Sequence, residues 1–360
     1  MSLSALPVPA AERPRRHFTA WSVLGLALGL SYLVSPCDLI TDPRPWIGHA
    51  DEAGAVLLGV AAAFLFAAPA RQRAPRSPLP AFLQFAIRGL RVDLGNFFFI
   101  QHRRVDGFVV TGKNSGSHWL KFMLSAGLAH KHGLPLPAYS TGRAADEIIG
   151  HPRGKQRIPG VKLIGTTHTI PSRLTKYVPA WLARRPPIVL MVRDIPAAML
   201  SNYNKWQDQY PAPIAEFAKG DPSGRRFIAD AWWYALFFNR WGAWAAADPT
   251  RILVLRYEDL VAEPALFLAR AASHLGLDFS PADLAAALRF TGKDDIRVRQ
   301  DPNAGETIVP HPAHPRQDFS PADRAAIAAI LARHLRWDFG YQLPGIAPSP
   351  AKSGAAAQAV

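Results

Sequence analysis

A turn of small and polar residues, placed between a β-rich apolar run and an apolar helical pattern, is the first segment that could bind a ligand. It reads Thr-Gly-Lys-Asn-Ser-Gly-Ser-His-Trp over residues 111–119. The backbone amides of such a turn and the N-terminus of the following helix can bind an anion. A magnesium-dependent nucleoside triphosphatase loop ends on lysine and a hydroxyl, whereas here Lys113 comes first. The alternative is a tight strand-to-helix turn with a glycine hinge and no ligand.

Two later apolar runs also end in polar residues. Arg193 follows the run at 188–192, and Ser201 lies in the helical pattern after it. A guanidinium at a strand end and a hydroxyl on the next helix can converge on one phosphate. The run at 252–255 ends in Tyr257 and Glu258, and a helical pattern starts at residue 264.

The elements that must position these residues alternate between strands and helices, which predicts an α/β fold with a parallel sheet flanked by helices. The clearest strands are residues 108–111, 161–165, 188–192 and 252–255. In open α/β sheets ligands bind at the carboxyl edge of the strands. We therefore expect the polar segments to meet at that edge.

Three motifs in this order resemble the sulfotransferase family: SGSHWL at 115–120, VRDIPAAMLSNY at 192–203 and LRYEDL at 255–260. The resemblance covers about residues 105–342. It implies a P-loop-like nucleotide-binding fold and 3'-phosphoadenosine 5'-phosphosulfate (PAPS) as donor cosubstrate, with no metal required. By this resemblance the 5'-phosphosulfate is held by the turn, Arg193 and Ser201 bind the 3'-phosphate, and Trp119 and Tyr257 contact the adenine. The turn residues concerned are Lys113, Asn114, Ser115, Gly116, Ser117 and His118.

The resemblance also implies a general base. The family's histidine lies after the second strand, and His168 in Gly-Thr-Thr-His occupies that place. Imidazole can take the acceptor's proton near neutral pH. The family's cation, a lysine directly before the Ser-Gly pair, is replaced by Asn114, and Thr166 replaces a second lysine. We favour the interpretation that Lys113 reaches the leaving oxygen and supplies the positive charge. Alternatively, His118 and backbone amides stabilise that oxygen, or the catalytic activity is impaired.

Looser matches to the family lie near the end of the domain. Thr291 is a candidate adenine contact, and Arg297 and Arg299 are candidates for the family's distal basic loop. The acceptor, a hydroxyl or amine compound, cannot be read from the sequence.

Two uncharged apolar segments, residues 18–34 and 53–70, have arginines outside them and acidic residues between them. Each has about the minimum length for crossing a bilayer, and the positive-inside bias places both outer ends in the cytoplasm. Residues 32–52 resemble the YkvA-like hairpin, a bacterial membrane-associated domain of unknown function. We predict a membrane-associated α-helical hairpin and a cytoplasmic catalytic domain. A cleaved signal peptide and a soluble helical hairpin are the alternatives.

Composition limits the remaining possibilities. The 360 residues are 49% hydrophobic and 19% charged, which predicts about two folded domains. The net charge of +14 fits an anionic partner. After a sulfotransferase and a catalytically impaired nucleotide-binding scaffold at the membrane, a nucleic-acid-binding protein is a distant third possibility. It rests on charge alone, so no nucleic acid is expected as a partner. Cys37 is the single cysteine and cannot form an internal disulfide.

The predicted domains are a hydrophobic hairpin at 1–76, a linker and basic amphipathic segment at 77–104, a sulfotransferase domain at 105–345 and a disordered tail at 346–360. Residues 82–100 are interpreted either as an interfacial amphipathic helix or as an ordinary core-packing helix. The aromatic run from Trp232 to Trp244 is expected to pack in the core. Two Asp-Phe-Ser-Pro-Ala-Asp segments, at 278–283 and 318–323, predict two similarly capped helices.

Overall fold

The computed structural model describes residues 79–96, 98–102, 104–136, 139, 142–151, 160–177, 185–207, 210, 212–289, 292, 298–299 and 316–343. The chain divides into two compact units, Met1–Ala74 and Pro75–Val360, and every described residue belongs to the second. The predicted hairpin at 1–76 and the tail at 346–360 lie outside the described residues. Among the helices of the described part, none is long and apolar enough to cross a membrane.

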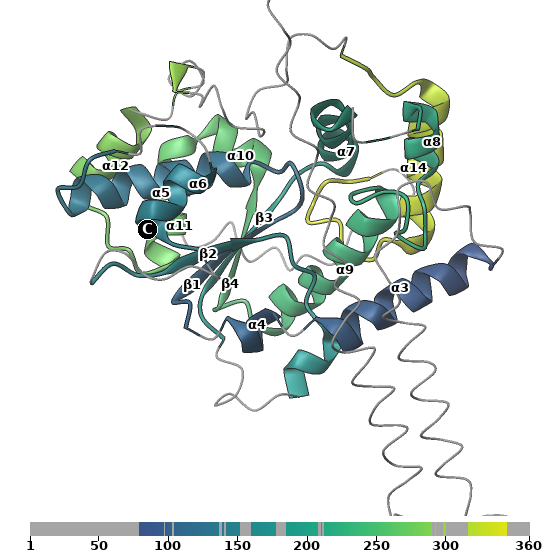
Figure 1. Cartoon of the computed structure of the whole chain (residues 1–360), viewed down its shortest axis with the longest axis horizontal. Helices are drawn as coiled ribbons and strands as arrows, with labels where there is room; N and C mark the ends of the chain where they lie inside the picture. The colour runs from purple at the N-terminus through teal and green to yellow at the C-terminus, as the bar shows by residue number, and fades with distance from the viewer. Residues whose placement is uncertain are drawn as a thin grey trace, which may run out of the picture. The chain divides into compact units, whose positions relative to one another are not determined.

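A four-stranded parallel sheet forms the centre of the second unit (Figure 1). Its strands are β1 (Gly107–Thr111), β2 (Ile164–Thr167), β3 (Ile188–Val192) and β4 (Ile252–Arg256), in the order β2-β1-β3-β4. β1 and β3 are buried along their whole length, as expected for apolar strands covered on both faces. The predicted α/β fold with a parallel sheet flanked by helices is confirmed.

Three strands differ from the prediction in their bounds, and β1 differs only by starting one residue earlier, at Gly107. The second strand was expected at 161–165 but begins at Ile164, because the N–H of Leu163 donates to the carboxylate of Asp106 (3.0 Å) rather than to a neighbouring strand. The fourth strand was expected at 252–255 and runs one residue further, to Arg256, after which Tyr257 begins the helix α10 (Tyr257–Ala262). The helix α11 (Pro264–His274) then starts where predicted.

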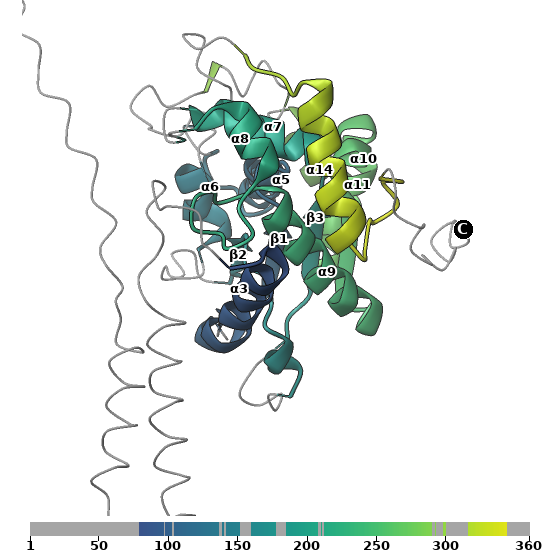
Figure 2. The same ribbon diagram turned by 90° about the vertical axis from the view of Figure 1, so that its right-hand side faces the viewer.

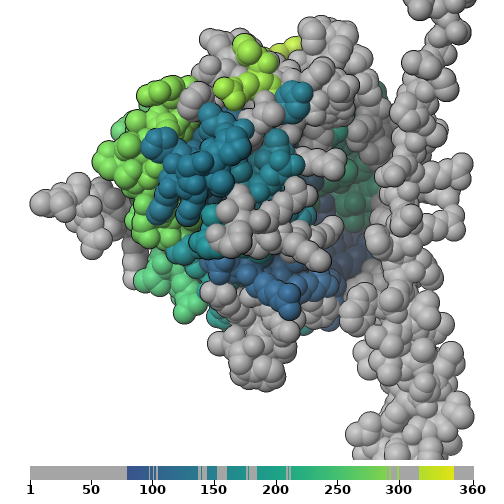
Figure 3. All heavy atoms as spheres, turned by 60° about the vertical axis from the view of Figure 1, so that its left-hand side comes forward, coloured from purple at the N-terminus to yellow at the C-terminus, as the bar shows by residue number. Residues whose placement is uncertain are grey.

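One face of the sheet is covered by α5, α10 and α11, with α6 and α12 packed further out (Figure 1). Val109, Val189 and Met191 point to this side and are fully buried. α5 spans Ser117–Lys131, α6 Gly142–Ile149 and α12 Pro281–Arg289. Atoms of α5 and α12 lie side by side on the face shown in Figure 3. Gly127 of α5 is needed there, since a Cβ atom at Gly127 would lie 2.4 Å from the Phe279 ring.

The opposite face is covered by α7 (Ile195–Lys205), α8 (Ile214–Lys219), α9 (Ala231–Ala247) and α14 (Pro321–His334). Phe108, Val110 and Leu190 point to this side, which follows from the two-residue period of a strand. α9 carries the aromatic run, and its tryptophans from 232 to 241 are buried, so the predicted core role is confirmed. α14 packs against α8 and α9, as Figure 2 shows.

The repeated hexapeptide caps two helices in the same way. The Ser280 hydroxyl accepts from the N–H of Asp283 (3.2 Å), and the Asp283 carboxylate accepts from the N–H of Ser280 (2.8 Å). Ser320 and Asp323 repeat this reciprocal pair at α14. The predicted pair of similarly capped helices is confirmed.

The segment before the sheet is helical. It forms α3 (Ala81–Gly95) and α4 (Phe98–Gln101), and a 3-10 turn, η1 (Arg173–Tyr177), packs against α3. α3 contacts α9 through the Asp93 carboxylate and Arg240 NH1, 2.6 Å apart. The interpretation of residues 82–100 as a core-packing helix holds in part, because Phe85, Val92 and Phe99 pack in the core.

Candidate functional site

The turn at residues 112–116 lies between β1 and α5, at the carboxyl edge of the sheet. It closes through two left-handed residues, Asn114 (φ 52°) and Gly116 (φ 87°). Asparagine tolerates this conformation better than other side chains that carry a Cβ. The buried Tyr234 hydroxyl of α9 donates to the backbone carbonyl of Lys113, and the Asn114 amide donates to the side-chain oxygen of Asn202 on α7 (2.7 Å). The turn is therefore held from both sides before any ligand binds.

Arg193, the first residue after β3, joins this turn. Its NH1 group donates to the carbonyl of Asn114 (2.9 Å), and its guanidinium carbon lies 4.5 Å from the centre of the Tyr257 ring. The next residue, Asp194, caps α7 by accepting from the N–H of Ala197 (2.9 Å). Within the described part of the chain, the other N–H donors of Arg193 have no hydrogen-bond partner. They remain available for an anionic ligand.

Tyr257 packs between the turn and α5. A Cβ atom at Gly116 would lie 2.6 Å from its ring, so only glycine fits at that position. The Trp119 ring meets it edge-on, with centroids 6.4 Å apart. No described residue forms a hydrogen bond with the hydroxyls of Ser117, Ser201 or Tyr257. The helix α5 has no side-chain cap, and the first turn of any helix leaves backbone N–H groups without helical partners.

His168 directly follows β2, because that strand ends at Thr167, two residues later than predicted. The register pairs Val110 with Thr167, which brings Thr111 next to His168. Its Nδ1 lies 2.9 Å from the carbonyl oxygen of Thr111 and 3.0 Å from the Thr111 hydroxyl. A carbonyl only accepts, so Nδ1 carries the proton and Nε2 of the neutral ring keeps its lone pair. This is the tautomer that a general base acting through Nε2 requires.

Positive charge surrounds both histidines of the site. Burial, and next the charge of Lys113, lower the pKa of His168 to about 4, whereas the hydrogen bond that its ring donates to the Thr111 carbonyl raises it. Burial also lowers the pKa of His118 to about 4, together with the charges of Lys205 and Lys121. The charge of Lys205 acts on His168 as well. Both imidazoles are neutral at pH 7, and the surrounding charge favours an anion.

The Glu258 carboxylate links the segment that follows β4 to the segment that follows β3. It accepts from the N–H of Asp194 (3.2 Å) and from the hydroxyl of Tyr341 (2.5 Å). Burial and the nearby charge of Glu258 raise the pKa of Asp194, which the hydrogen bond from Ala197 partly opposes. These contacts fix the start of α7 relative to α10 without placing another cation in the site.

The structure thus brings together most of the residues singled out in the sequence. Lys113, Asn114 and the buried Ser115 lie in the turn, and the buried Ser117 begins α5. Ser201 is half-buried on the second turn of α7. Arg299 is half-buried in an isolated described segment of two residues. Thr291 and Arg297 lie outside the described residues.

Four residues of the site were not found from the sequence: Thr111, Asn202, Lys205 and Tyr234. Asn202 follows Ser201 directly, and Lys205 lies one helical turn beyond Ser201, so helix periodicity offered a signal for Lys205. Tyr234 gave no signal, because it belongs to an aromatic run that reads as core. Thr111 acts partly through its backbone carbonyl, which no side-chain pattern reveals.

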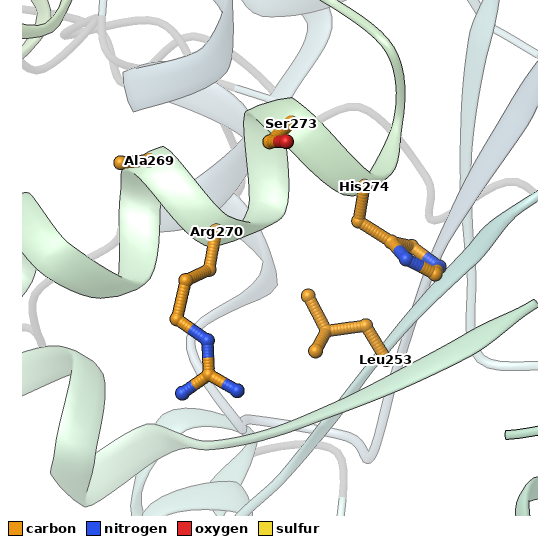
Figure 4. A pocket seen from close by; sticks show the side chains of 5 residues that line it. All are labelled: Leu253, Ala269, Arg270, Ser273 and His274. Carbon is orange, nitrogen blue, oxygen red and sulfur yellow. The ribbon is translucent and has the colours of Figure 1, made fainter. Parts of the chain in front are cut away.

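A pocket of about 460 Å³ lies elsewhere, between β4 and α11 (Figure 4). Arg270 and His274 extend from α11 towards Leu253 of the strand. Leu253 is near the amino end of β4, so this pocket lies towards the opposite edge of the sheet from the turn. Among the described residues there is no group of three His, Cys, Asp or Glu that could hold a metal.

The fold and the site define a parallel α/β domain with an anion-binding turn, a strand-end arginine and a neutral histidine at one sheet edge. Residues 182–281 match a family model described as "Sulfotransferase family", and residues 22–58 match one described as "Protein of unknown function (DUF1232)". The resemblances to the sulfotransferase family and to the YkvA-like hairpin are confirmed. The first matched range contains Arg193, Ser201 and Tyr257, whereas the turn and His168 lie outside it.

The chain is also similar to solved structures. These include a mouse sulfotransferase complexed with PAP (16% identity, 69% of this chain and 89% of that chain, TM-score 0.42). A sulfotransferase from Alicyclobacillus acidocaldarius is 14% identical over 64% of this chain and 92% of that chain, with a TM-score of 0.35. A retinol dehydratase in complex with retinol and PAP is 15% identical over 59% and 70%, with a TM-score of 0.35. No curated protein matches the sequence.

Proposed function

We propose that this protein transfers a sulfuryl group from PAPS to a hydroxyl or amine acceptor. One observation carries the proposal: the turn before α5 is bonded directly to Arg193 through the Asn114 carbonyl, while Thr111, which ends β1, holds His168. Two anion-binding elements and a base therefore converge at one sheet edge. A phosphosulfate and a separate phosphate on one nucleotide would satisfy both elements.

The donor would bind across the carboxyl edge. The N-terminus of α5 and the turn hold the 5'-phosphosulfate, and Arg193 with the Ser201 hydroxyl holds the 3'-phosphate. Charge-assisted bonds from a guanidinium to phosphate are among the stronger hydrogen bonds of proteins. Trp119 and Tyr257, which already contact each other, supply an aromatic surface for the adenine.

In the reaction, the acceptor oxygen attacks the sulfur atom while the bond from sulfur to the 5'-phosphate oxygen breaks. The acceptor's proton passes to Nε2 of His168, and 3'-phosphoadenosine 5'-phosphate leaves. Thr111 fixes the ring by accepting the Nδ1 proton, so the basic nitrogen is the one left to face the acceptor. The low pKa of about 4 keeps the base neutral before the donor binds.

Charge on the leaving oxygen must be stabilised in the transition state. Asn114 cannot supply a cation, and its amide is bonded to Asn202. Lys113 and His118 both lie close enough to His168 to lower its pKa, but burial lowers the pKa of His118 to about 4, which leaves Lys113 as the choice for the cation. The same reasoning adds Lys205, whose charge acts on both histidines. No metal ion is needed in this scheme.

The proposal includes a place in the cell. The hairpin at residues 1–76 would attach the protein to a membrane, with the catalytic domain on the cytoplasmic side. An acceptor that is itself membrane-bound would fit this location, although a carbohydrate or phenolic hydroxyl has the same reacting group.

A second candidate is a nucleotide-binding scaffold with impaired turnover. The observation in its favour is Asn114, because the position directly before the Ser-Gly pair carries no charge. Binding without transfer would support this candidate, and transfer would exclude it.

Calorimetry with 3'-phosphoadenosine 5'-phosphate tests the site. Arg193→Ala and Ser201→Ala should both weaken binding, and Arg193→Ala should weaken it more. The matched control is Arg270→Ala, an exposed arginine beside the pocket at the other edge of the sheet, which should leave affinity unchanged. Unchanged affinity in both site variants would refute the assignment. Labelled PAPS offered with lipid, carbohydrate and phenolic acceptors then tests transfer.

A further inference from the structure

The loop between α8 and α9, residues 220–230, packs against α3 through an arginine of that helix. A Cβ atom at Gly224, whose φ is 68°, would lie 2.6 Å from Nε of Arg88, so the loop lies directly on this side chain. NH1 of Arg88 also donates to the backbone carbonyl of Asp221 (3.3 Å). Figures 1 and 2 both show α3 next to α9, the helix that this loop enters.

The same contact brings a second arginine of α3 next to an arginine of the loop. Arg91 lies one helical turn beyond Arg88, and Arg225 follows Gly224 directly. Both are half-buried, and Nε of Arg91 is fully buried. Burial lowers the pKa of Arg91, and the nearby charge of Arg225 lowers it further. Two positive charges therefore lie close together where water screens them only in part.

The carboxylates of this region already have partners. The buried Asp230 lies 3.4 Å from NH1 of Arg88, and Glu216 of α8 lies 2.7 Å from NH1 of Arg226. The carboxylate of Asp221 accepts from backbone N–H groups of the loop itself. Each of these carboxylates is bonded to a group other than the two neighbouring arginines.

Arg91 and Arg225 thus lack a local counterion. No described residue forms an ion pair with either guanidinium or accepts a hydrogen bond from it. The other arginines that reach α3, Arg173 and Arg240, both pair with the Asp93 carboxylate. Partial burial of two like charges is unfavourable, and a bound anion relieves it. Guanidinium groups match the oxygen atoms of phosphate and sulfate through paired N–H donors.

We propose that Arg91 and Arg225 form a binding site for a phosphate or sulfate group, between α3 and the loop at 220–230. The donor nucleotide does not account for this site, because its two anionic groups are assigned to the turn before α5 and to Arg193. A free ion and a group carried on a larger ligand offer the same chemistry. The experiment separates these two sources, and the site does not depend on sulfuryl transfer.

The test follows the site itself by NMR. The full chain is labelled with 15N-arginine, and Arg91→Gln and Arg225→Gln assign the two Nε–H signals. Sodium phosphate or sodium sulfate then replaces sodium chloride at constant ionic strength, with and without 3'-phosphoadenosine 5'-phosphate. Phenyl phosphate is the probe for a carried group. Arg270→Gln, at the exposed arginine of α11, is the matched control.

We expect a saturable shift of the Arg91 signal with phosphate and sulfate. Arg225→Gln should weaken this binding by about tenfold or more, since a lost hydrogen bond to a charged group costs at least about 1.5 kcal/mol, and Arg270→Gln should leave it unchanged. The signal of Arg225 in Arg91→Gln gives the same test if the first variant folds poorly. Phenyl phosphate that binds as tightly as inorganic phosphate would support a carried group, and inorganic ions alone would support an enclosed ion.

Three results would overturn the proposal: a shift that does not saturate, an equal response to chloride, or affinity that both variants retain. Competition with 3'-phosphoadenosine 5'-phosphate would overturn it too, because the arginines would then belong to the donor site. The signal of Arg91 reports on this site whether or not the nucleotide binds. Failure here is therefore distinct from failure of the proposed enzyme activity.

Discussion

The ring of His168 is hydrogen-bonded to Thr111 and has cations nearby. The hydrogen bond raises the pKa of the imidazole, whereas the cations lower it. Burial and Lys113 lower its pKa to about 4, so the ring is neutral above that pH and protonates only in strong acid. Lys113→Met should raise the pKa towards the ordinary 6.5, because a repelling charge is removed. NMR titration of the imidazole measures this, and Lys219→Met, an exposed lysine of α8, is the control. A pKa unchanged by Lys113→Met would remove Lys113 from the site.

Replacement of the base separates chemistry from binding. His168→Ala should lower transfer on the order of 100-fold, the usual range for a lost general base, with nucleotide affinity nearly unchanged. Rapid-quench transfer assays and calorimetry on the same variant give the two numbers. Transfer at the wild-type rate would mean that another group takes the proton.

Asn114 has a conformational reason for its side chain. A residue with a Cβ at φ 52° costs roughly 1–2 kcal/mol, which asparagine reduces by bonding locally. Asn114→Lys would restore the family's cation but lose the bond to Asn202. We therefore expect transfer to fall by about tenfold, the equivalent of about 1.4 kcal/mol.

The control for that variant is Asn114→Gly, which accepts the left-handed turn and keeps the carbonyl that Arg193 needs. It should retain nucleotide affinity within a few-fold of the wild type. Faster transfer by Asn114→Lys would contradict the prediction and would favour the scaffold candidate for the natural protein.

At the scale of elements, the Asp93 carboxylate bonds α3 to both α9 and η1. Burial alone would raise the pKa of Asp93, but hydrogen bonds from Arg240 and Arg173 outweigh it and the net pKa is lowered. Asp93→Asn leaves buried Arg240 without its counterion and should cost about 3–5 kcal/mol of unfolding free energy. Denaturant unfolding measures this cost. Asp318→Asn, which breaks the exposed pair with Arg324, should cost less than about 1 kcal/mol.

The pH dependence of that difference has a definite sign. A lowered folded pKa means that the Asp93 contribution is complete above the ordinary pKa of 3.8 and is lost as pH falls through the lower, folded value. The gap between wild type and Asp93→Asn should therefore be constant near neutrality and shrink only in acid. A gap that shrinks already between pH 7 and 5 would mean that another group carries the stability.

Sequence patterns predicted the strands and helices that are determined by local features, such as a continuous apolar run or a helix-capping segment. β1 and β3 are continuous apolar runs, and the two Ser-Pro-Ala-Asp starts fix helix ends locally. The patterns failed where tertiary contacts decide the bounds or the attachment of an element. The start of β2 is set by the bond between Leu163 and Asp106, and Asp93 of α3 is bonded to arginines of α9 and η1. In the site, Arg193 and Tyr257 were predicted from their side-chain types and positions. The backbone carbonyl of Thr111 and the hydroxyl of Tyr234, within a core helix, could not be recognised from the sequence.

At the scale of the whole molecule, membrane attachment should depend on the predicted hairpin. Deletion of residues 1–74 should release the catalytic domain from membranes that have been washed at alkaline pH, because the two apolar segments are removed. Sedimentation of the washed membranes measures the released fraction. A truncated chain that still resists alkaline washing would show that the anchor lies beyond residue 74.

The bond between Asn114 and Asn202 joins two positions far apart in the sequence, and the amide nitrogen of Asn202 in turn donates to the Tyr210 hydroxyl (2.5 Å). In a lineage where a lysine enters the turn at 114, the side-chain oxygen at 202 loses the amide that donates to it. Divergence at these two positions should therefore be concerted: descendants that regain lysine before the Ser-Gly pair should carry a different residue at 202, and those that keep both asparagines should have inherited the same closed turn.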